Sequence, residues 1–267
     1  MRTEGTFEIY ALRFATREST KSQEFFRYEV YRSPDSFQRL DYFFWLVKND
    51  TFTVLVDCGF NRERGLTKGR PQETSPLALL ERMGVAPSDV DFVIITHMHY
   101  DHVGNVDLFP NAVVILARDE YEFWAGPYGS REIMRSIVFP EEVSLVQDIE
   151  RQGRLRLIGD STEVVPGVLA RKLGGHTPGQ VIVEVQSPSE SIVLASDAAH
   201  YYEEIELDRP YKLYDDIGKM YGALDALREL ARRPNTTVVA GHDPRVTEMF
   251  HAVEPNCFDL TARRKIG

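Results

Sequence analysis

Four side chains that could bind metal lie within six residues, His97-Met98-His99-Tyr100-Asp101-His102. The preceding segment, 92–96, reads Phe-Val-Ile-Ile-Thr and is typical of a buried strand, so polar side chains emerge where a core strand ends. Two histidines separated by one residue point to the same side of an extended chain, and His97 and His99 can therefore bind one ion together. Asp101 and His102 could face a neighbouring ion if the chain then turns.

Three further candidate ligands follow later in the chain. His176 lies in the glycine-rich stretch 174–179, Asp197 follows the predicted strand that ends at Ser196, and His242 follows the segment 238–241, which reads Val-Val-Ala-Gly. A carboxylate has two oxygens and can bridge two cations, so Asp197 is the predicted shared ligand. We predict that His97, His99 and His176 bind one ion and that Asp101, His102 and His242 bind the other.

The segments that must position these residues alternate between strand and helix patterns. Concentrations of Val, Ile and aromatic residues predict strands at 7–14, 42–47, 53–57, 92–96, 112–117, 180–185, 191–196 and 236–240. Three- and four-residue apolar spacing predicts helices at 75–82, 118–124 and 216–232, the last capped by Asp215 or Asp216. Two strand-rich parts with helices between them predict an α/β fold in which two sheets pack together. No repeat or linker divides the 267 residues, so we expect one domain spanning 1–267.

Composition narrows the choice of partner and location. A net charge of −10 would repel a nucleic-acid backbone. No apolar run approaches the roughly 20 residues of a membrane-spanning helix, and the first residues lack the pattern of a signal peptide. The two cysteines, Cys58 and Cys257, are expected to be reduced thiols. We expect a cytoplasmic protein that acts on a small molecule, without nucleic-acid or membrane partners; a homodimer is allowed.

These residues together resemble the metallo-β-lactamase superfamily, whose H-x-H-x-D-H motif stands here as His97 to His102. His176, Asp197 and His242 match the remaining ligands in order and context, and the segment from Leu55 to Gly59 resembles the strand that precedes the family motif. The resemblance covers most of the chain. It implies an αββα sandwich of two mixed β-sheets flanked by helices, with Asp57 supporting the site without binding metal.

The resemblance also implies two divalent metal ions. Zinc is the expected metal for a histidine-rich site, with Mn, Fe or Co as alternatives. Two cations that share a water can lower its pKa towards about 7, so hydrolysis by a bridging hydroxide is the simplest use of the site. Asp101 could help move a proton to the leaving group.

Within the superfamily the chain is most similar to the N-acyl homoserine lactonase branch, because of its long segment before His97, the interval from His176 to Asp197, and the position of His242 near the end. Broad-spectrum β-lactamases place Cys where Asp197 stands. The expected reaction is the opening of a lactone ring, in an N-acyl homoserine lactone or a related lactone. The alternatives are a thioesterase or another ester or amide hydrolase on the same site, and an iron-dependent oxidoreductase similar to persulfide dioxygenases.

One position departs from the lactonase pattern. In that branch a tyrosine three residues after the bridging aspartate typically contacts the substrate carbonyl, whereas His200 stands at that offset here and Tyr201 follows. Either side chain could donate a hydrogen bond to a developing oxyanion, so His200 and Tyr201 join Asp101 as catalytic candidates. A supporting or packing role for His200 is the alternative.

Overall fold

The computed structural model describes residues 6–186 and 190–263. Its helices and strands, in chain order, are β1 (Glu8–Thr20), α1 (Lys21–Glu24), β2 (Phe37–Lys48), β3 (Thr53–Val56), α2 (Arg62–Thr67), α3 (Pro76–Arg82), β4 (Phe92–Ile94), α4 (Tyr100–Val103), β5 (Val113–Ala117), α5 (Arg118–Ala125), α6 (Pro140–Arg151), β6 (Leu155–Ile158), β7 (Ser161–Val165), β8 (Val168–Lys172), β9 (Val181–Gln186), β10 (Ser191–Ser196), α7 (Tyr202–Leu207), α8 (Ile217–Ala231), β11 (Thr236–Ala240), α9 (Arg245–Met249), β12 (Phe250–Glu254) and β13 (Cys257–Arg263).

Within these ranges the strands form two sheets. The larger has eight strands in the order β12-β13-β1-β2-β3-β4-β5-β6, and the smaller has five in the order β11-β10-β9-β8-β7. Both sheets are mixed. In the larger sheet, strands β3 to β6 pair in parallel, whereas β1 and β2 pair antiparallel. In the smaller sheet, β10 pairs in parallel with β11 and antiparallel with β9. The predicted αββα architecture is confirmed.

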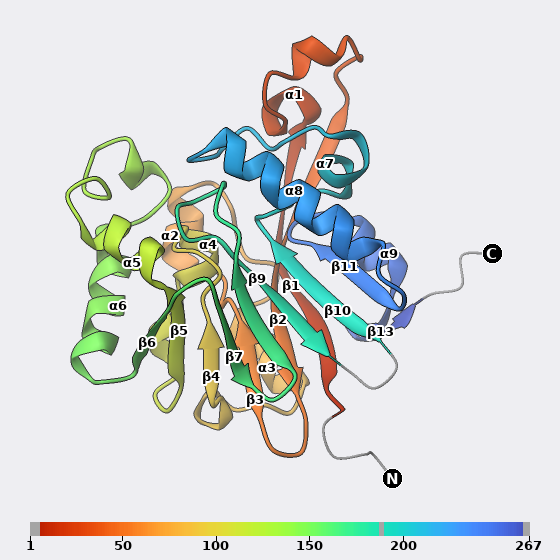
Figure 1. Cartoon of the computed structure of the whole chain (residues 1–267). Helices are drawn as coiled ribbons and strands as arrows, with labels where there is room; N and C mark the ends of the chain where they lie inside the picture. Colours follow the sequence, from red (N-terminus) through yellow and green to blue (C-terminus); the bar gives the residue numbers. More distant parts are fainter. Residues whose placement is uncertain (1–5, 187–189, 264–267) are drawn as a thin grey trace.

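The alternation of side chains along each strand produces three apolar layers. On β9, Val181, Val183 and Val185 belong to the layer between the sheets, whereas Ile182 belongs to the layer on the outer face of the small sheet. Successive residues of a strand point to opposite faces, so one strand serves both layers. Helix α8 covers this outer face with Leu224 and Leu227 (Figure 1). On the opposite side, α3 and α6 contribute to the layer that covers the large sheet.

The predicted elements are all present, with bounds that shift. The helix predicted at 216–232 is α8, and the side chain of Asp216 caps it by accepting a hydrogen bond from the Lys219 amide at 3.1 Å. Strand β1 extends to Thr20, beyond the predicted end at Phe14. None of the helices in the described residues is both long enough and apolar enough to cross a membrane.

Candidate metal centre

The seven predicted ligands gather at one edge of the sandwich, although they come from distant parts of the sequence. His97 and His99 follow β4, and Asp101 and His102 lie on the single turn of α4. His176 lies between β8 and β9, Asp197 follows β10, and His242 comes two residues after β11. Each candidate ligand therefore stands just beyond a core strand, in a loop between two strands, or on the short helix α4 that follows β4, where buried backbone fixes its position.

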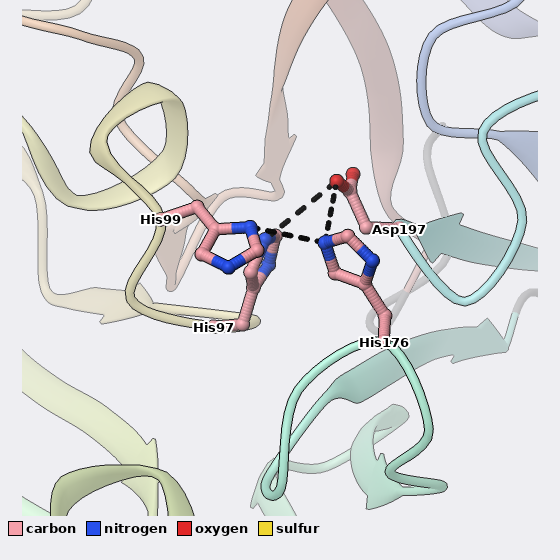
Figure 2. Close-up of side chains that lie close together, drawn as sticks. All are labelled: His97, His99, His176 and Asp197. Atoms are coloured by element: carbon pink, nitrogen blue, oxygen red, sulfur yellow. Dashed lines mark hydrogen bonds and ion pairs between the residues drawn. The ribbon is translucent and has the colours of Figure 1, made fainter. Parts of the chain in front are cut away.

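The ligand atoms form two groups that match the two predicted sites. His97, His99, His176 and Asp197 make one group, and Asp101, His102 and His242 make the other; within each group the ligand atoms lie within 4.8 Å of one another. Figure 2 shows the first group, with the three imidazoles and the Asp197 carboxylate converging on one point. Asp101 is half-buried, and the other six are buried.

Asp197 lies between the two groups and turns one carboxylate oxygen to each. Its Oδ2 atom lies 3.2 Å from Nε2 of His176 and 3.6 Å from Nε2 of His97. Its Oδ1 atom lies 3.0 Å from Nε2 of His242 and 3.3 Å from Nε2 of His102. A carboxylate that faces two sets of imidazoles in this way has the geometry of a bridging ligand.

Several atoms of the centre lack the hydrogen bonds that buried polar atoms normally make. Nε2 of His97, Nε2 of His102 and Oδ1 of Asp197 are buried and have no hydrogen-bond partner among the described residues. An unpaired buried polar atom costs free energy, and three such atoms at one point indicate that they bind a group from outside the chain. Imidazole nitrogens and carboxylate oxygens are ligands suited to zinc and related transition metals. The donor set therefore fits two divalent cations.

The protonation of the first group suits metal binding. Burial, followed by the neighbouring imidazoles, holds the pKa of His97 and of His99 well below the ordinary value. Both rings are thus neutral and keep a free lone pair. Burial disfavours charge on Asp197 as well, but the surrounding histidines outweigh it and hold its pKa well below the ordinary value.

The second group attracts positive charge. Burial opposes a charge on His102, yet Asp197, Asp57 and Asp101 outweigh burial and raise its pKa well above the ordinary value. A bound cation would supply that positive charge in place of the proton.

Hydrogen bonds outside the ligand set orient the imidazole rings. Nδ1 of His102 lies 2.7 Å from Oδ2 of Asp57, so the role predicted for Asp57 agrees with its position. Nδ1 of His176 lies 2.8 Å from the Leu213 carbonyl oxygen, and Nδ1 of His242 lies 2.8 Å from the Asp41 carbonyl oxygen. Each contact engages the nitrogen that faces away from the centre and leaves Nε2 directed inward.

Glu120, on α5, joins the two loops that carry the three histidines of the first group. Its Oε1 accepts hydrogen bonds from the Met98 amide at 2.9 Å and from the Trp124 indole at 2.7 Å, and its Oε2 accepts one from the Gly179 amide at 2.8 Å. A Cβ at Gly179 would lie 2.5 Å from the Glu120 Cβ, so this close approach requires glycine. The sequence reasoning missed Glu120; its only signal was a carboxylate at a position that belongs to the buried face of the predicted helix 118–124.

The structure separates the two candidates that follow Asp197. Nε2 of His200 lies 2.9 Å from Oδ2 of Asp197, and its ring stacks on Tyr211 with centroids 3.5 Å apart and an interplanar angle of 15°. Burial opposes a charge on His200, but Asp197 and Glu204 raise its pKa to about 9. His200 therefore directs its Nε2 atom at the carboxylate of Asp197, and its ring borders the same cavity as the candidate ligands.

Tyr201 lies elsewhere. Its ring is buried against Phe25 at a centroid distance of 5.5 Å, and it borders a different cavity from the one at the ligands. The tyrosine that borders the ligand cavity beside His200 is Tyr211, which the sequence reasoning did not select.

Two cavities meet at the centre. One, of about 490 Å³, is bordered by ligands of both groups together with Tyr42, Tyr211 and several cationic side chains. The other, of about 290 Å³, is bordered chiefly by apolar side chains that include Phe123, Trp124, Ile133 and Met134. His99 and His176 border both cavities. Phe123 and Trp124 lie on α5, the helix predicted at 118–124, and border this apolar cavity.

Comparison with known proteins agrees with this fold and centre. The model of the metallo-β-lactamase superfamily matches residues 39–242. This match covers most of the chain, and the chain belongs to that superfamily.

Relatives of similar length carry more specific names. The chain is 26% identical over 227 residues to the N-acyl homoserine lactonase AiiA of Bacillus thuringiensis subsp. kurstaki, a match that covers 79% of this chain and 84% of the relative. The fold of this chain is similar to that of a crystal structure described as a quorum-quenching N-acyl homoserine lactone lactonase. The TM-score is 0.74 at 22% identity, and the match covers 95% of this chain and 98% of the other. AidC, described as a dizinc quorum-quenching lactonase, superposes with a TM-score of 0.72 at 19% identity, covering 90% of this chain and 88% of AidC.

Proposed function

We propose that this protein is a dinuclear metal-dependent hydrolase that opens a lactone ring. The observation that carries the proposal is the position of Asp197, whose two carboxylate oxygens face two separate groups of ligands. The names of the similar lactonases favour a lactone as substrate over a thioester or an amide.

The metal ligands in this proposal are the seven residues of the two groups, with Asp197 shared. Zinc is the proposed metal, because the site is rich in histidine and because one structural neighbour is described as a dizinc enzyme. When bound, a pair of divalent cations lowers the pKa of a coordinated water and polarises a carbonyl oxygen.

The chain's own residues arrange the remaining chemistry. In the overall reaction, water adds to the lactone carbonyl carbon, the bond between that carbon and the ring oxygen breaks, and the ring oxygen takes up a proton to become a hydroxyl. We assign the handling of that proton to Asp101, because it borders the cavity, is only half-buried, and has Oδ2 3.8 Å from Nε2 of His102.

The proposal gives the substrate carbonyl a hydrogen-bond donor in Tyr211. This side chain borders the cavity and stacks on His200. Burial is the main cause that raises the pKa of Tyr211, and the nearby carboxylate of Asp197 adds to the shift. A phenol directed at a developing oxyanion stabilises it most in a site from which water is excluded. His200 acts differently, by holding the Asp197 carboxylate in position through its Nε2 atom.

Metal analysis coupled to a substrate panel tests the proposal. Protein loaded with zinc is expected to bind two ions per chain and to convert simple γ-lactones and N-acyl homoserine lactones to hydroxy acids. His97→Ala should lose both metal and turnover, whereas His251→Ala, which alters an exposed histidine on β12, should keep both. Thioester hydrolysis much faster than that of any lactone, or a single iron with consumption of oxygen, would contradict the proposal.

A cytoplasmic location and a homodimer are further parts of the sequence-based prediction that we retain as proposals. Size-exclusion chromatography with light scattering tests the second of these.

A further inference from the structure

The cavity at the metal centre has a charge opposite to that of the whole chain. The protein carries 41 acidic and 31 basic residues, for a net charge of −10. The lining of the 490 Å³ cavity nevertheless contains four cationic side chains, Arg17, Lys68, Arg70 and Lys212, and only two carboxylates, Asp101 and Asp197. Both carboxylates belong to the candidate metal centre, so bound cations would neutralise them.

One of the four cations is already paired. Nη2 of Arg17 lies 2.8 Å from the buried carboxylate of Glu24. Lys68, Arg70 and Lys212 form no ion pair with any carboxylate in the part of the chain that the structure describes. Burial, and then the nearby Arg70 guanidinium, lower the pKa of Lys68, whereas the carboxylates of Glu142 and Asp101 oppose this shift.

Lys68 and Arg70 both lie close to one aromatic ring, that of Tyr100, which precedes Asp101. Nζ of Lys68 lies 5.8 Å from the ring centroid of Tyr100, and Cζ of Arg70 lies 5.6 Å from it. Arg70 also donates a hydrogen bond to the Tyr100 hydroxyl. Since Tyr100 directly precedes Asp101, both cations lie close to the second group of ligands.

The segment that carries these two cations is fixed rather than free. Gln72 forms an antiparallel bridge with Ala15 of β1, and its side chain donates a hydrogen bond to the Phe60 carbonyl at 2.7 Å. The Arg70 amide donates to the Gly65 carbonyl at 2.8 Å. A cation on an anchored backbone loses less conformational entropy when it binds an anion, so it contributes more to affinity.

We infer that the substrate carries an anionic group, a carboxylate in the simplest case, and that Lys68 and Arg70 bind this group while the lactone carbonyl lies at the metal centre. The inference rests on the proposed lactonase function and specifies its substrate class. Lys212 borders the same cavity and adds to its positive potential. The adjoining 290 Å³ apolar cavity leaves room for a hydrophobic substituent on the other side of His99 and His176.

A matched pair of substrates tests the inference. 5-Oxotetrahydrofuran-2-carboxylic acid and its primary carboxamide share one lactone ring and differ in one negative charge. With zinc-loaded protein, we expect kcat/KM for the acid to exceed that for the amide by about tenfold, chiefly through a lower KM, because a charge-assisted contact contributes on that scale. Rising salt should reduce the ratio.

Variants connect the ratio to the named side chains. Arg70→Gln and, separately, Lys68→Gln should each bring the acid-to-amide ratio towards one, whereas Arg232→Gln, at an exposed position after α8, should leave the ratio at its wild-type value. The use of two variants guards against a folding defect in either one. Calorimetry supplies a readout without turnover: 2-hydroxyglutarate, the ring-opened form of the acid, should bind more tightly than the ring-opened amide and should lose this advantage in Arg70→Gln.

The possible failures can be told apart. Turnover of both lactones at equal efficiency, with equal binding of the two ring-opened compounds, would overturn the inference and leave the lactonase proposal in place. Absence of turnover for every lactone, with 2-hydroxyglutarate binding that depends on Arg70, would overturn the lactonase proposal and support the anion site. A preference for the acid that both variants retain would also overturn the assignment to Lys68 and Arg70.

Discussion

Asp57 directs its Oδ2 atom at Nδ1 of His102 across 2.7 Å and at the same time holds the end of β4. Its Oδ1 accepts a hydrogen bond from the Thr96 amide at 2.8 Å, and its Oδ2 accepts one from the Thr96 hydroxyl at 2.9 Å. The backbone of Asp57 has φ of +61°, a left-handed conformation that aspartate and asparagine tolerate better than most residues. One buried carboxylate thus fixes both His102 and the end of the segment that leads from β4 to His97 and His99.

Replacement of this carboxylate should weaken metal binding. Asp57→Asn keeps the left-handed backbone and one oxygen acceptor but removes the negative charge opposite His102. Loss of such a partner typically lowers metal affinity about 10- to 100-fold, and we expect that loss at the group formed by Asp101, His102 and His242. Competition with a chromophoric chelator measures the metal affinity of the variant and of the wild type. Asp50→Asn, at an exposed turn, is the matched control; equal affinity in both variants would refute the role of Asp57.

Tyr211→Phe should separate hydrogen bonding from stacking. The variant keeps the ring that stacks on His200 but removes the hydroxyl. If that hydroxyl stabilises the oxyanion, kcat on a lactone should fall about 100-fold while the metal content stays at two ions per chain. Steady-state kinetic assays measure kcat, and metal analysis measures the number of ions per chain. Tyr128→Phe, at an exposed tyrosine, should leave kcat unchanged; a Tyr211→Phe protein with wild-type kcat would show that another group contacts the carbonyl.

Glu120→Gln should loosen the first group of ligands. The Glu120 carboxylate accepts three hydrogen bonds, and an amide would place an N–H group against one of those donors. We expect the free energy of unfolding to fall by about 1–3 kcal/mol and the metal affinity at His97, His99 and His176 to fall with it. Denaturant titration and chelator competition measure the two effects.

The same helix offers a control for Glu120. Glu122 is exposed on α5, so Glu122→Gln keeps the helix and changes charge by the same amount. Equal unfolding free energies for the two variants would mean that Glu120 does not join the loops as described.

Glu142 should make stability depend on pH. Its carboxylate is buried beside Arg64, at 2.9 Å, and burial raises its pKa from 4.5 to about 7. Between these two values the folded protein keeps a proton that the unfolded chain releases, so stability falls as pH rises from 4.5 to 7 and is then constant with respect to this group. The loss amounts to about 3 kcal/mol.

Thermal or denaturant unfolding at pH 5 and pH 8 tests this expectation. Glu142→Gln cannot ionise and should lose less stability than the wild type between these two pH values. Glu141→Gln, at the exposed neighbouring position, should follow the wild-type curve. A steeper loss of stability with pH in Glu142→Gln than in the wild type would contradict the assignment of this pH dependence to the Glu142 carboxylate.

The sequence predicts the strands that contain a clear run of apolar or aromatic residues and misses strands such as β7 that lack one. Strands β4, β5, β10 and β11 are short runs of buried residues, and each was predicted within a few residues. Strand β7 has only its last two residues buried, so its sequence lacks the apolar run that marked the others. Helix α6 was also missed, although Pro140 at its start and the Glu142 carboxylate, which accepts a hydrogen bond from the Phe139 amide at 3.0 Å, mark a helix N-terminus.

Prediction of the site was limited in a different way. The seven candidate ligands could be selected because a sequence pattern indicates both their residue type and their place near strand ends. Glu120, Arg70 and Tyr211 carry no such pattern, since their roles depend on which loop the tertiary fold brings against them. Tyr201 is the opposite case, a residue that the sequence selects and the fold places elsewhere. Its proximity to Asp197 in sequence suggests a role in the site, but its ring packs against Phe25.

The position of Asp197 between ligands from both sheets has a consequence for the unfolded chain. His97 and His242 leave different sheets and are separated by more than half of the sequence, so ions shared through Asp197 would close long loops of polypeptide. Closing a long loop removes entropy from the unfolded ensemble, as a disulfide does, and the effect grows with loop length. Cys58 and Cys257 are both free thiols. In this protein the metal centre would therefore serve as a reversible cross-link that ties the N-terminal and C-terminal halves of the polypeptide together.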